Sequence, residues 1–181
     1  MDTVTALALR ARDGDRQALN RFIQLTQGDV WRMCRHMVDA NSADDLTQDV
    51  FERAISALHR LTPDSNAKSW LLGVARHVCI DEIRRRVRRT KRDDLYRASI
   101  DRETEVTSEL SIEWREQLSK LDEEKRLAFV LTQVVGLSYE EAAEVAGCPV
   151  GTIRSRVARA RLELLDAVKR LNGEQRSSDA V

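Results

Sequence analysis

The chain has 181 residues, enough for one medium domain or two small ones, and its formal net charge is zero. Hydrophobic residues make up 42% of it, charged residues 33% and aromatic residues 4%, with 7 Gly and 2 Pro. This composition is typical of helical bundles, and no alternating run of Val, Ile and Thr is long enough for a strand. The zero net charge argues against a protein that coats nucleic acid nonspecifically.

Several function classes lack their usual signatures. Cys34, Cys79 and Cys148 lie far apart and form no CxxC pair, which argues against a disulfide framework or a zinc site. No apolar run approaches the roughly 18 residues of a membrane span, and the N-terminus has no signal-peptide pattern. No Ser/His/Asp arrangement or P-loop is present. We therefore expect a cytoplasmic protein that is not an enzyme, does not engage a membrane and uses no metal or cofactor.

The spacing of apolar residues predicts an all-α fold of two small helical domains. We expect the first domain to span residues 1–92 and the second to span 108–172. A flexible acidic linker, 93–107, should join them, because this stretch is rich in acids and has too few apolar residues to form a core. Residues 173–181 should form a frayed tail.

In the first domain, apolar residues recur at helical spacing over 7–23 and 30–37. A third helix should begin near Ser42, a capping residue type, with Asp45 three residues later. Its inward positions are Leu46, Val50, Phe51, Ala54, Ile55 and Leu58. After a turn-rich segment, a fourth helix should start near Ala67. Its buried centre is Leu71, Ala75 and Val78, with Leu72 and Cys79 beside them.

Two helix surfaces in this domain have contrasting charge. Asp45, Gln48, Asp49 and Glu52 share one face of the third helix, which repels DNA and can receive a basic protein. A stripe on the fourth helix combines an aromatic ring, a gap, an imidazole and arginines: Trp70, Gly73, His77, Arg84 and Arg88. Aromatic rings stack on unpaired bases and arginines hold phosphates. The plainer alternatives are a solvated acidic face, a half-buried tryptophan and a solvated helix end.

The stripe continues into a basic run, 84–92, with seven basic residues in nine. Continuity with Trp70 and His77 favours a nucleic-acid path over a simple charged helix end that complements the helix dipole.

Residues 137–168 predict a helix-turn-helix. Ser138 and Glu141 have capping-box spacing, Gly147 permits a left-handed turn, and Pro149 suits the start of the next helix. The second helix has a buried stripe of Ile153, Val157, Ala160, Leu164, Val168 and Leu171. Its opposite face has Thr152, Ser155 and Arg159, flanked by Arg154 and Arg156. A helix with such a face fits the DNA major groove, and the alternative is a solvated surface helix.

Four segments carry a further signal: DDLTQDVF at 44–51, SWLLGVAR at 69–76, LSYEEAA at 137–143 and CPVGTIRSR at 148–156. In this order they resemble the bacterial RNA polymerase sigma factors of the extracytoplasmic-function (ECF) group. Within this group the chain is most similar to the actinobacterial sigma-C type. The resemblance covers nearly the whole chain, and four motifs in register are far more specific than one.

The resemblance implies an alternative sigma factor that binds the clamp region of core RNA polymerase and helps melt promoter DNA. It implies polymerase contacts at Asp45, Gln48 and Asp49. Together with the stripe on the fourth helix, it implies contacts to the single-stranded −10 element at Leu61, Asp64, Ser65, Asn66, Trp70, His77, Arg84 and Arg88. It implies contacts to the duplex −35 element at Gly151, Thr152, Arg154, Ser155, Ala158 and Arg159. An anti-sigma partner stays open, and a stand-alone helix-turn-helix regulator is the alternative function.

Overall fold

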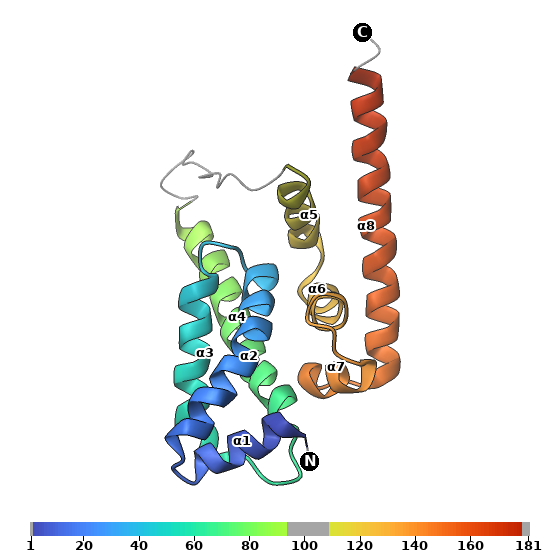
Figure 1. Ribbon diagram of the computed structural model, residues 1–181. Coiled ribbons are helices and arrows are strands. Elements are labelled where there is room, and N and C mark those ends of the chain that lie inside the picture. Colours follow the sequence, from blue (N-terminus) through green and yellow to red (C-terminus); the bar gives the residue numbers. More distant parts are fainter. Residues whose placement is uncertain (1, 94–108, 179–181) are drawn as a thin grey trace.

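The computed structural model describes residues 2–93 and 109–178, which are helical throughout apart from short turns (Figure 1). The first block comprises α1 (Thr3–Arg12), α2 (Arg16–Met37), α3 (Ala43–Ala57), a 3-10 turn (Leu58–Arg60) and α4 (Ala67–Asp93). The second comprises α5 (Glu109–Lys120), α6 (Glu123–Phe129), a π-helical segment (Val130–Val134), α7 (Tyr139–Ala146) and α8 (Val150–Ser178). The described ranges contain no strand, and the predicted all-α class is confirmed.

Short polar side chains begin several of these helices. The Asp2 carboxylate accepts from the Thr5 backbone N–H at 2.9 Å, and Asp15 accepts from Gln17 and Ala18 at the start of α2. Asp122 caps α6 in the same way. Each carboxylate satisfies a backbone donor that has no partner within its helix. Ser42 does precede α3, but the predicted capping bond is wrong, since its side chain makes no cap hydrogen bond.

The core of the first block follows the predicted stripes closely. The predicted centre of α4, around Leu71 and Ala75, is fully buried. On α3, Leu46, Val50, Phe51 and Ala54 are buried as predicted, as is Leu58 after it. Ile55 is the exception, because its side chain is 43% exposed on the outer edge of α3.

Cys34 and Cys79, far apart in the sequence, lie side by side in this core with their Sγ atoms 3.8 Å apart. Both are buried free thiols. The hydrogen bond that Cys79 donates lowers the pKa of Cys34 and raises that of Cys79. The thiol pair therefore belongs to the packing between α2 and α4, as predicted for Cys79.

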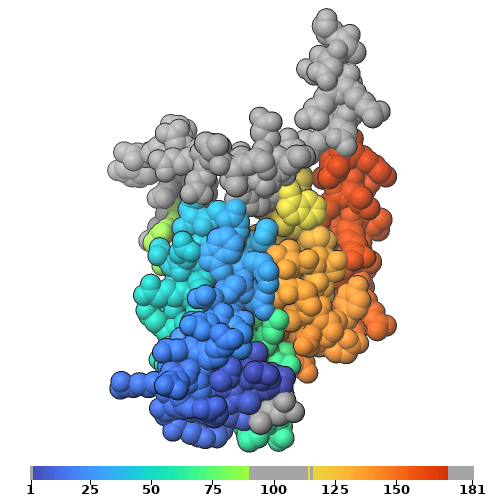
Figure 2. Space-filling model, in the orientation of Figure 1, coloured from blue at the N-terminus to red at the C-terminus, as the bar shows by residue number. Residues whose placement is uncertain are grey.

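The two blocks pack against each other (Figure 2). They share one hydrophobic core. α7 lies against α4, and the π-helical segment lies against α2. Arg126 of α6 also donates a hydrogen bond to the Met37 carbonyl at the end of α2, at 2.9 Å. The sequence analysis predicted two domains and left open whether they pack together. Of the predicted linker, Asp93 is the last residue of α4, and the rest lies outside the described residues.

α8 is longer than predicted and projects past the rest of the molecule in Figure 1. It continues to Ser178, so most of the predicted tail is helical. A single glycine costs a helix only about 1 kcal/mol relative to Ala, which is too little to end it at Gly173. Val168 is exposed and Ala167 is buried instead, so the predicted inward stripe is wrong at that position. No helix in the described ranges could cross a membrane.

Candidate polymerase and nucleic-acid interfaces

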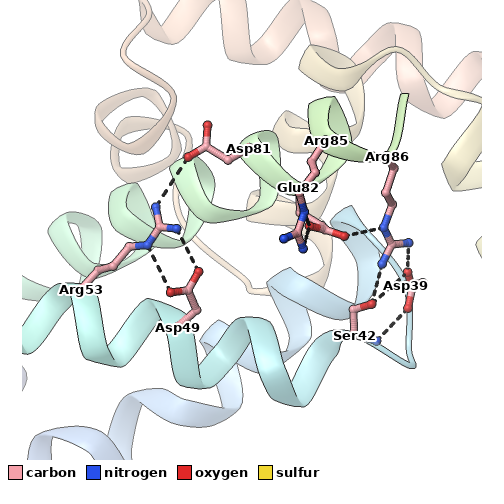
Figure 3. Close-up of polar contacts among 8 residues, drawn as sticks. All are labelled: Asp39, Ser42, Asp49, Arg53, Asp81, Glu82, Arg85 and Arg86. Carbon is pink, nitrogen blue, oxygen red and sulfur yellow. Dashed lines mark hydrogen bonds and ion pairs between the residues drawn. The ribbon is translucent and has the colours of Figure 1, made fainter. Parts of the chain in front are cut away.

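The acidic face of α3 exists as predicted. Asp45 and Gln48 are exposed and Asp49 is half-buried. Gln48 donates to the Glu52 carboxylate at 2.9 Å, and Asp49 forms an ion pair with Arg53 at 3.0 Å. Arg53 also approaches Asp81 of α4 at 3.5 Å (Figure 3). Arg53 therefore neutralises part of the negative charge of this face and links α3 to α4.

The first turn of α3 is tied to both neighbouring helices. The Trp31 indole N–H donates to the Asp44 carboxylate at 2.8 Å, which links α2 to α3. The Arg86 guanidinium of α4 donates to Asp39 and Ser42 in the turn between α2 and α3 (Figure 3). These bonds link the start of α3 and the turn before it to α2 and α4.

The start of α4 and the turn before it form one wall of a groove of about 550 Å³. Predicted −10 residues come together here: Asp64, Ser65, Asn66, Trp70 and His77. Gly73 lies between the two rings, and no atom comes within 4 Å of the position where a Cβ would stand. The groove therefore combines an aromatic face, an imidazole and open space beside the helix.

Leu61 is not part of this groove. Its side chain is buried, and its carbonyl accepts a hydrogen bond from Arg12 at 3.0 Å. The Leu61 side chain is therefore not available to a strand in this arrangement, and the contact at Leu61 stays a prediction. Asn66 is partly committed as well, since its side-chain oxygen caps α4 by accepting from the Ser69 N–H at 2.9 Å.

Two residues of the groove were missed by the sequence analysis. The Ser69 hydroxyl and the Arg76 Nε are buried without a hydrogen-bond partner among the described residues. Ser69 lies one helical turn after Asn66, and Arg76 lies one helical turn after Gly73. This spacing from residues already identified could have indicated both in the sequence.

The opposite wall of the groove is α7 of the second block. Glu144, Val145 and Gly147 line it. Val145 is only 4% exposed, so the groove that holds the predicted −10 residues lies at the junction between the two blocks. The sequence analysis did not predict this wall.

The arginines of the basic run at the end of α4 differ in whether they form ion pairs. Arg84 and Arg88 are exposed and form no ion pair with any described residue. Arg85 and Arg86 both donate to Glu82, a carboxylate with only 8% of its side chain exposed. Burial raises the pKa of Glu82, but hydrogen bonds from the two guanidinium groups outweigh it and lower the pKa overall. The two arginines predicted as strand contacts are thus exposed and have no ion pair with a described residue.

The helix-turn-helix has the predicted local geometry. Ser138 and Glu141 form the reciprocal capping box, and Gly147 adopts φ 65°, the left-handed conformation. α8 then begins one residue after Pro149. The predicted contact residues Gly151, Arg154, Ser155, Ala158 and Arg159 are exposed, and Thr152 is half-buried.

The arginines of α8 differ in the side chains that they contact. Arg156 turns inward to pair with Glu124 of α6 and to reach the Cys148 sulfur. Arg154 lies over the Tyr139 ring at 5.8 Å and near the Glu140 carboxylate at 3.9 Å. Arg159 points outward without an ion pair in the described part of the chain. The outward face is therefore Arg154, Ser155, Ala158 and Arg159.

We expect Ser138→Ala to lower the free energy of unfolding by about 0.5–2 kcal/mol, because it removes an N-cap. The Glu141 N–H would lose its bond to the serine hydroxyl, now 3.1 Å. Urea denaturation followed by circular dichroism would measure the change. Ser155→Ala, an exposed serine inside α8, is the control and should change stability by less than about 0.5 kcal/mol. Equal effects of the two substitutions would contradict the capping role.

Comparison with known proteins agrees with this geometry. The Sigma-70 region 2 family matches residues 22–89, and the Sigma-70 region 4 family matches residues 111–164. The chain is 49% identical over 167 residues to a probable RNA polymerase sigma-C factor of Mycobacterium bovis, covering 91% of this chain and 90% of the relative. It is 30% identical to the ECF RNA polymerase sigma-E factor of Escherichia coli, covering 88% and 91%.

Solved structures give the same result. CnrH in complex with the cytosolic domain of CnrY has a TM-score of 0.75 at 26% identity, covering 93% of this chain and 98% of that one. RpoE of Bartonella quintana, solved with the anti-sigma factor NepR, has a TM-score of 0.70 at 27% identity, covering 83% and 96%. With two matched regions in the expected order and relatives that span nearly its whole length, the chain belongs to the ECF family of RNA polymerase sigma factors.

Proposed function

We propose that this sigma factor binds core RNA polymerase through the acidic face of α3, holds the opened −10 strand along α4 and reads the −35 element with α8. Directing polymerase to promoters is the role of the family, and the division of that role among these three surfaces is the proposal. What supports it most is one observation: Asp64, Ser65, Asn66, Trp70 and His77 meet in a single groove.

Docking on polymerase would depend on the negative charge of the acidic face of α3. Asp45, Gln48 and Asp49 lie at the start of α3, and acidic side chains there suit a basic partner surface. Gln48 adds a donor and an acceptor between the two carboxylates. These three residues are the proposed contacts to the clamp region of core polymerase.

The groove beside Trp70 would hold unpaired bases. Trp70 offers a ring for stacking, and the space at Gly73 lets a strand approach the helix. Arg84 and Arg88 continue along α4 and would hold phosphates. Because α7 forms the opposite wall, the helix-turn-helix must move away from α4 before a strand can enter.

The exposed face of α8 would enter the major groove at the −35 element. Arg154 and Arg159 can donate to base edges, with Ser155 between them. Ala158 would contact a thymine methyl, and Gly151 and Thr152 would approach phosphates near the start of the helix.

The relatives also suggest an inhibitor and a cellular site. CnrH and the Bartonella RpoE were solved with a partner, in the second case an anti-sigma factor. An anti-sigma factor is therefore the proposed regulator of this chain, which would act in the cytoplasm with polymerase and DNA. A stand-alone helix-turn-helix regulator would need no polymerase-docking face, and the resemblance to sigma factors over both blocks argues against it.

Two substitutions in the holoenzyme would test the division between duplex and strand. Arg159→Ala should weaken the closed promoter complex by about 1–3 kcal/mol if the guanidinium reads a base. Trp70→Ala should leave the closed complex nearly intact and lower the open fraction, because stacking on an unpaired base contributes about 1–3 kcal/mol. A closed-complex binding assay beside permanganate footprinting of unpaired thymines measures both.

Each substitution has a matched control. Arg161→Ala removes an exposed arginine of α8 that bonds to Gln133 and is not one of the proposed contacts, so it should spare −35 recognition. Trp70→Phe keeps an aromatic face and should retain most of the open fraction. If Trp70→Ala weakened closed and open complexes alike, Trp70 would be a core residue and the strand-opening role would belong elsewhere on α4.

A further inference from the structure

Arg86 of α4 bonds to two residues of the turn between α2 and α3. The Arg86 guanidinium donates to the Asp39 carboxylate and to the Ser42 hydroxyl, and its Nε donates to Glu82 on its own helix at 2.7 Å (Figure 3). Asp39 also accepts from the Ser42 backbone N–H at 2.8 Å. Asp39, Ser42 and Arg86 therefore form a closed set of bonds between this turn and α4.

The hydrogen bonds of this set favour the ionised forms of both Asp39 and Arg86. Burial raises the pKa of Asp39, yet hydrogen bonds from Ser42 and Arg86 outweigh it and leave the pKa below its usual value. Burial lowers the pKa of Arg86, and its bonds to Glu82 and Asp39 more than compensate. A planar guanidinium can address several acceptors at fixed angles, which the single ammonium of lysine cannot.

The sequence does not indicate that Arg86 bonds to the α2–α3 turn. Arg86 stands inside the basic run 84–92, whose composition indicates nucleic-acid binding. In the structure its neighbours Arg84 and Arg88 are exposed, while Arg86 turns toward the α2–α3 turn, 44 residues away at Ser42. Arg85 pairs with Glu82 on the same helix and makes no contact with the α2–α3 turn within the described ranges.

Ser42 is the residue immediately before α3, and its hydroxyl bonds to Arg86 instead of capping the helix. Asp45, Gln48 and Asp49 follow within the first two turns of α3. Movement of Ser42 would therefore rotate or fray the beginning of the helix that carries them. The Trp31 to Asp44 bond restrains the same turn from the side of α2.

We propose that Arg86 is a positioning residue for polymerase binding: by tying Asp39 and Ser42 to α4, it fixes the start of α3 and hence the acidic docking face. This inference rests on the proposed docking role of that face. It assigns one arginine of the basic run to protein docking and not to DNA.

The test titrates labelled full-length protein with core polymerase and then scores promoter opening at saturating core. Arg86→Ala should weaken core binding about tenfold, a loss of about 1.4 kcal/mol. At saturating core its open fraction should match that of the unaltered chain, because Arg86 would not touch the strand. Arg86→Lys should recover only part of the affinity, since lysine retains the positive charge but lacks the planar guanidinium that reaches several acceptors.

Asp39→Asn is the sharper variant, because removing an acid cannot weaken attraction to DNA. It should lower core affinity as Arg86→Ala does, and the double variant should be no weaker than either one, as expected for partners in one interaction. Arg85→Ala is the matched control and should stay within about twofold of the unaltered affinity. Asp39→Asn keeps the test valid should Arg86→Ala fail to fold.

Two results would overturn the inference. One is a core affinity for both Arg86→Ala and Asp39→Asn no weaker than that of Arg85→Ala. The other is a reduced open fraction at saturating core for Arg86→Ala, which would return Arg86 to the DNA path. Failure of the docking proposal is distinct, because then charge reversal at Asp45 and Asp49 would also leave core binding unchanged.

Discussion

Replacing Asp45 and Asp49 together by lysine should reduce binding to core RNA polymerase by about 1,000-fold or more. Loss of one partner from a desolvated charge pair costs about 2–5 kcal/mol, and two such losses reach this range. The reversed charges would also repel a basic partner. Both side chains have solvent access and contribute little to the core, so helicity by circular dichroism should be unchanged.

Core binding is measured by co-purification and by titration of the labelled protein. Asp166→Lys, an exposed reversal on α8, is the control for net charge and should bind core normally. Arg53→Ala is informative in the other direction, because it frees Asp49 from its 3.0 Å ion pair and should preserve or strengthen binding. Undiminished co-purification of the double lysine variant would exclude α3 as the docking surface.

Val145→Asp should open the junction between the blocks and increase the affinity of the free protein for a single-stranded −10 oligonucleotide. Val145 is 4% exposed on the α7 wall of the groove. Burying an unpaired carboxylate there costs several kcal/mol, so arrangements in which α7 leaves α4 become favoured. Because apparent affinity scales with the fraction of molecules in the binding-competent state, a rise of about tenfold or more is expected.

Fluorescence anisotropy with a labelled oligonucleotide measures the affinity, and a −35 duplex serves as the internal check that the helix-turn-helix remains folded. Glu144→Gln, at the exposed neighbouring position, is the control and should leave the junction closed. An unchanged single-strand affinity, with −35 binding retained, would mean that the groove admits a strand without separation of the blocks.

Sequence alone determined the features that depend on residues a few positions apart. The capping box of Ser138 and Glu141, the left-handed Gly147 and the buried stripe of α4 all follow from local geometry and a period of 3.6 residues. The acidic face of α3 follows from the same period. The outward arginine face of α8 does too, and all of these patterns are visible without knowing what packs against each helix.

Tertiary structure alone decided how similar residues divide their roles. Arg84 and Arg86 both belong to the basic run 84–92, but only Arg86 reaches Asp39, 47 residues away. Leu61 is buried because α1 covers the turn, where Arg12 bonds to its carbonyl. α7 closes the strand groove because the two blocks share one core. Each of these outcomes depends on contacts between elements distant in the chain, where helical periodicity carries no information about which partner a side chain meets.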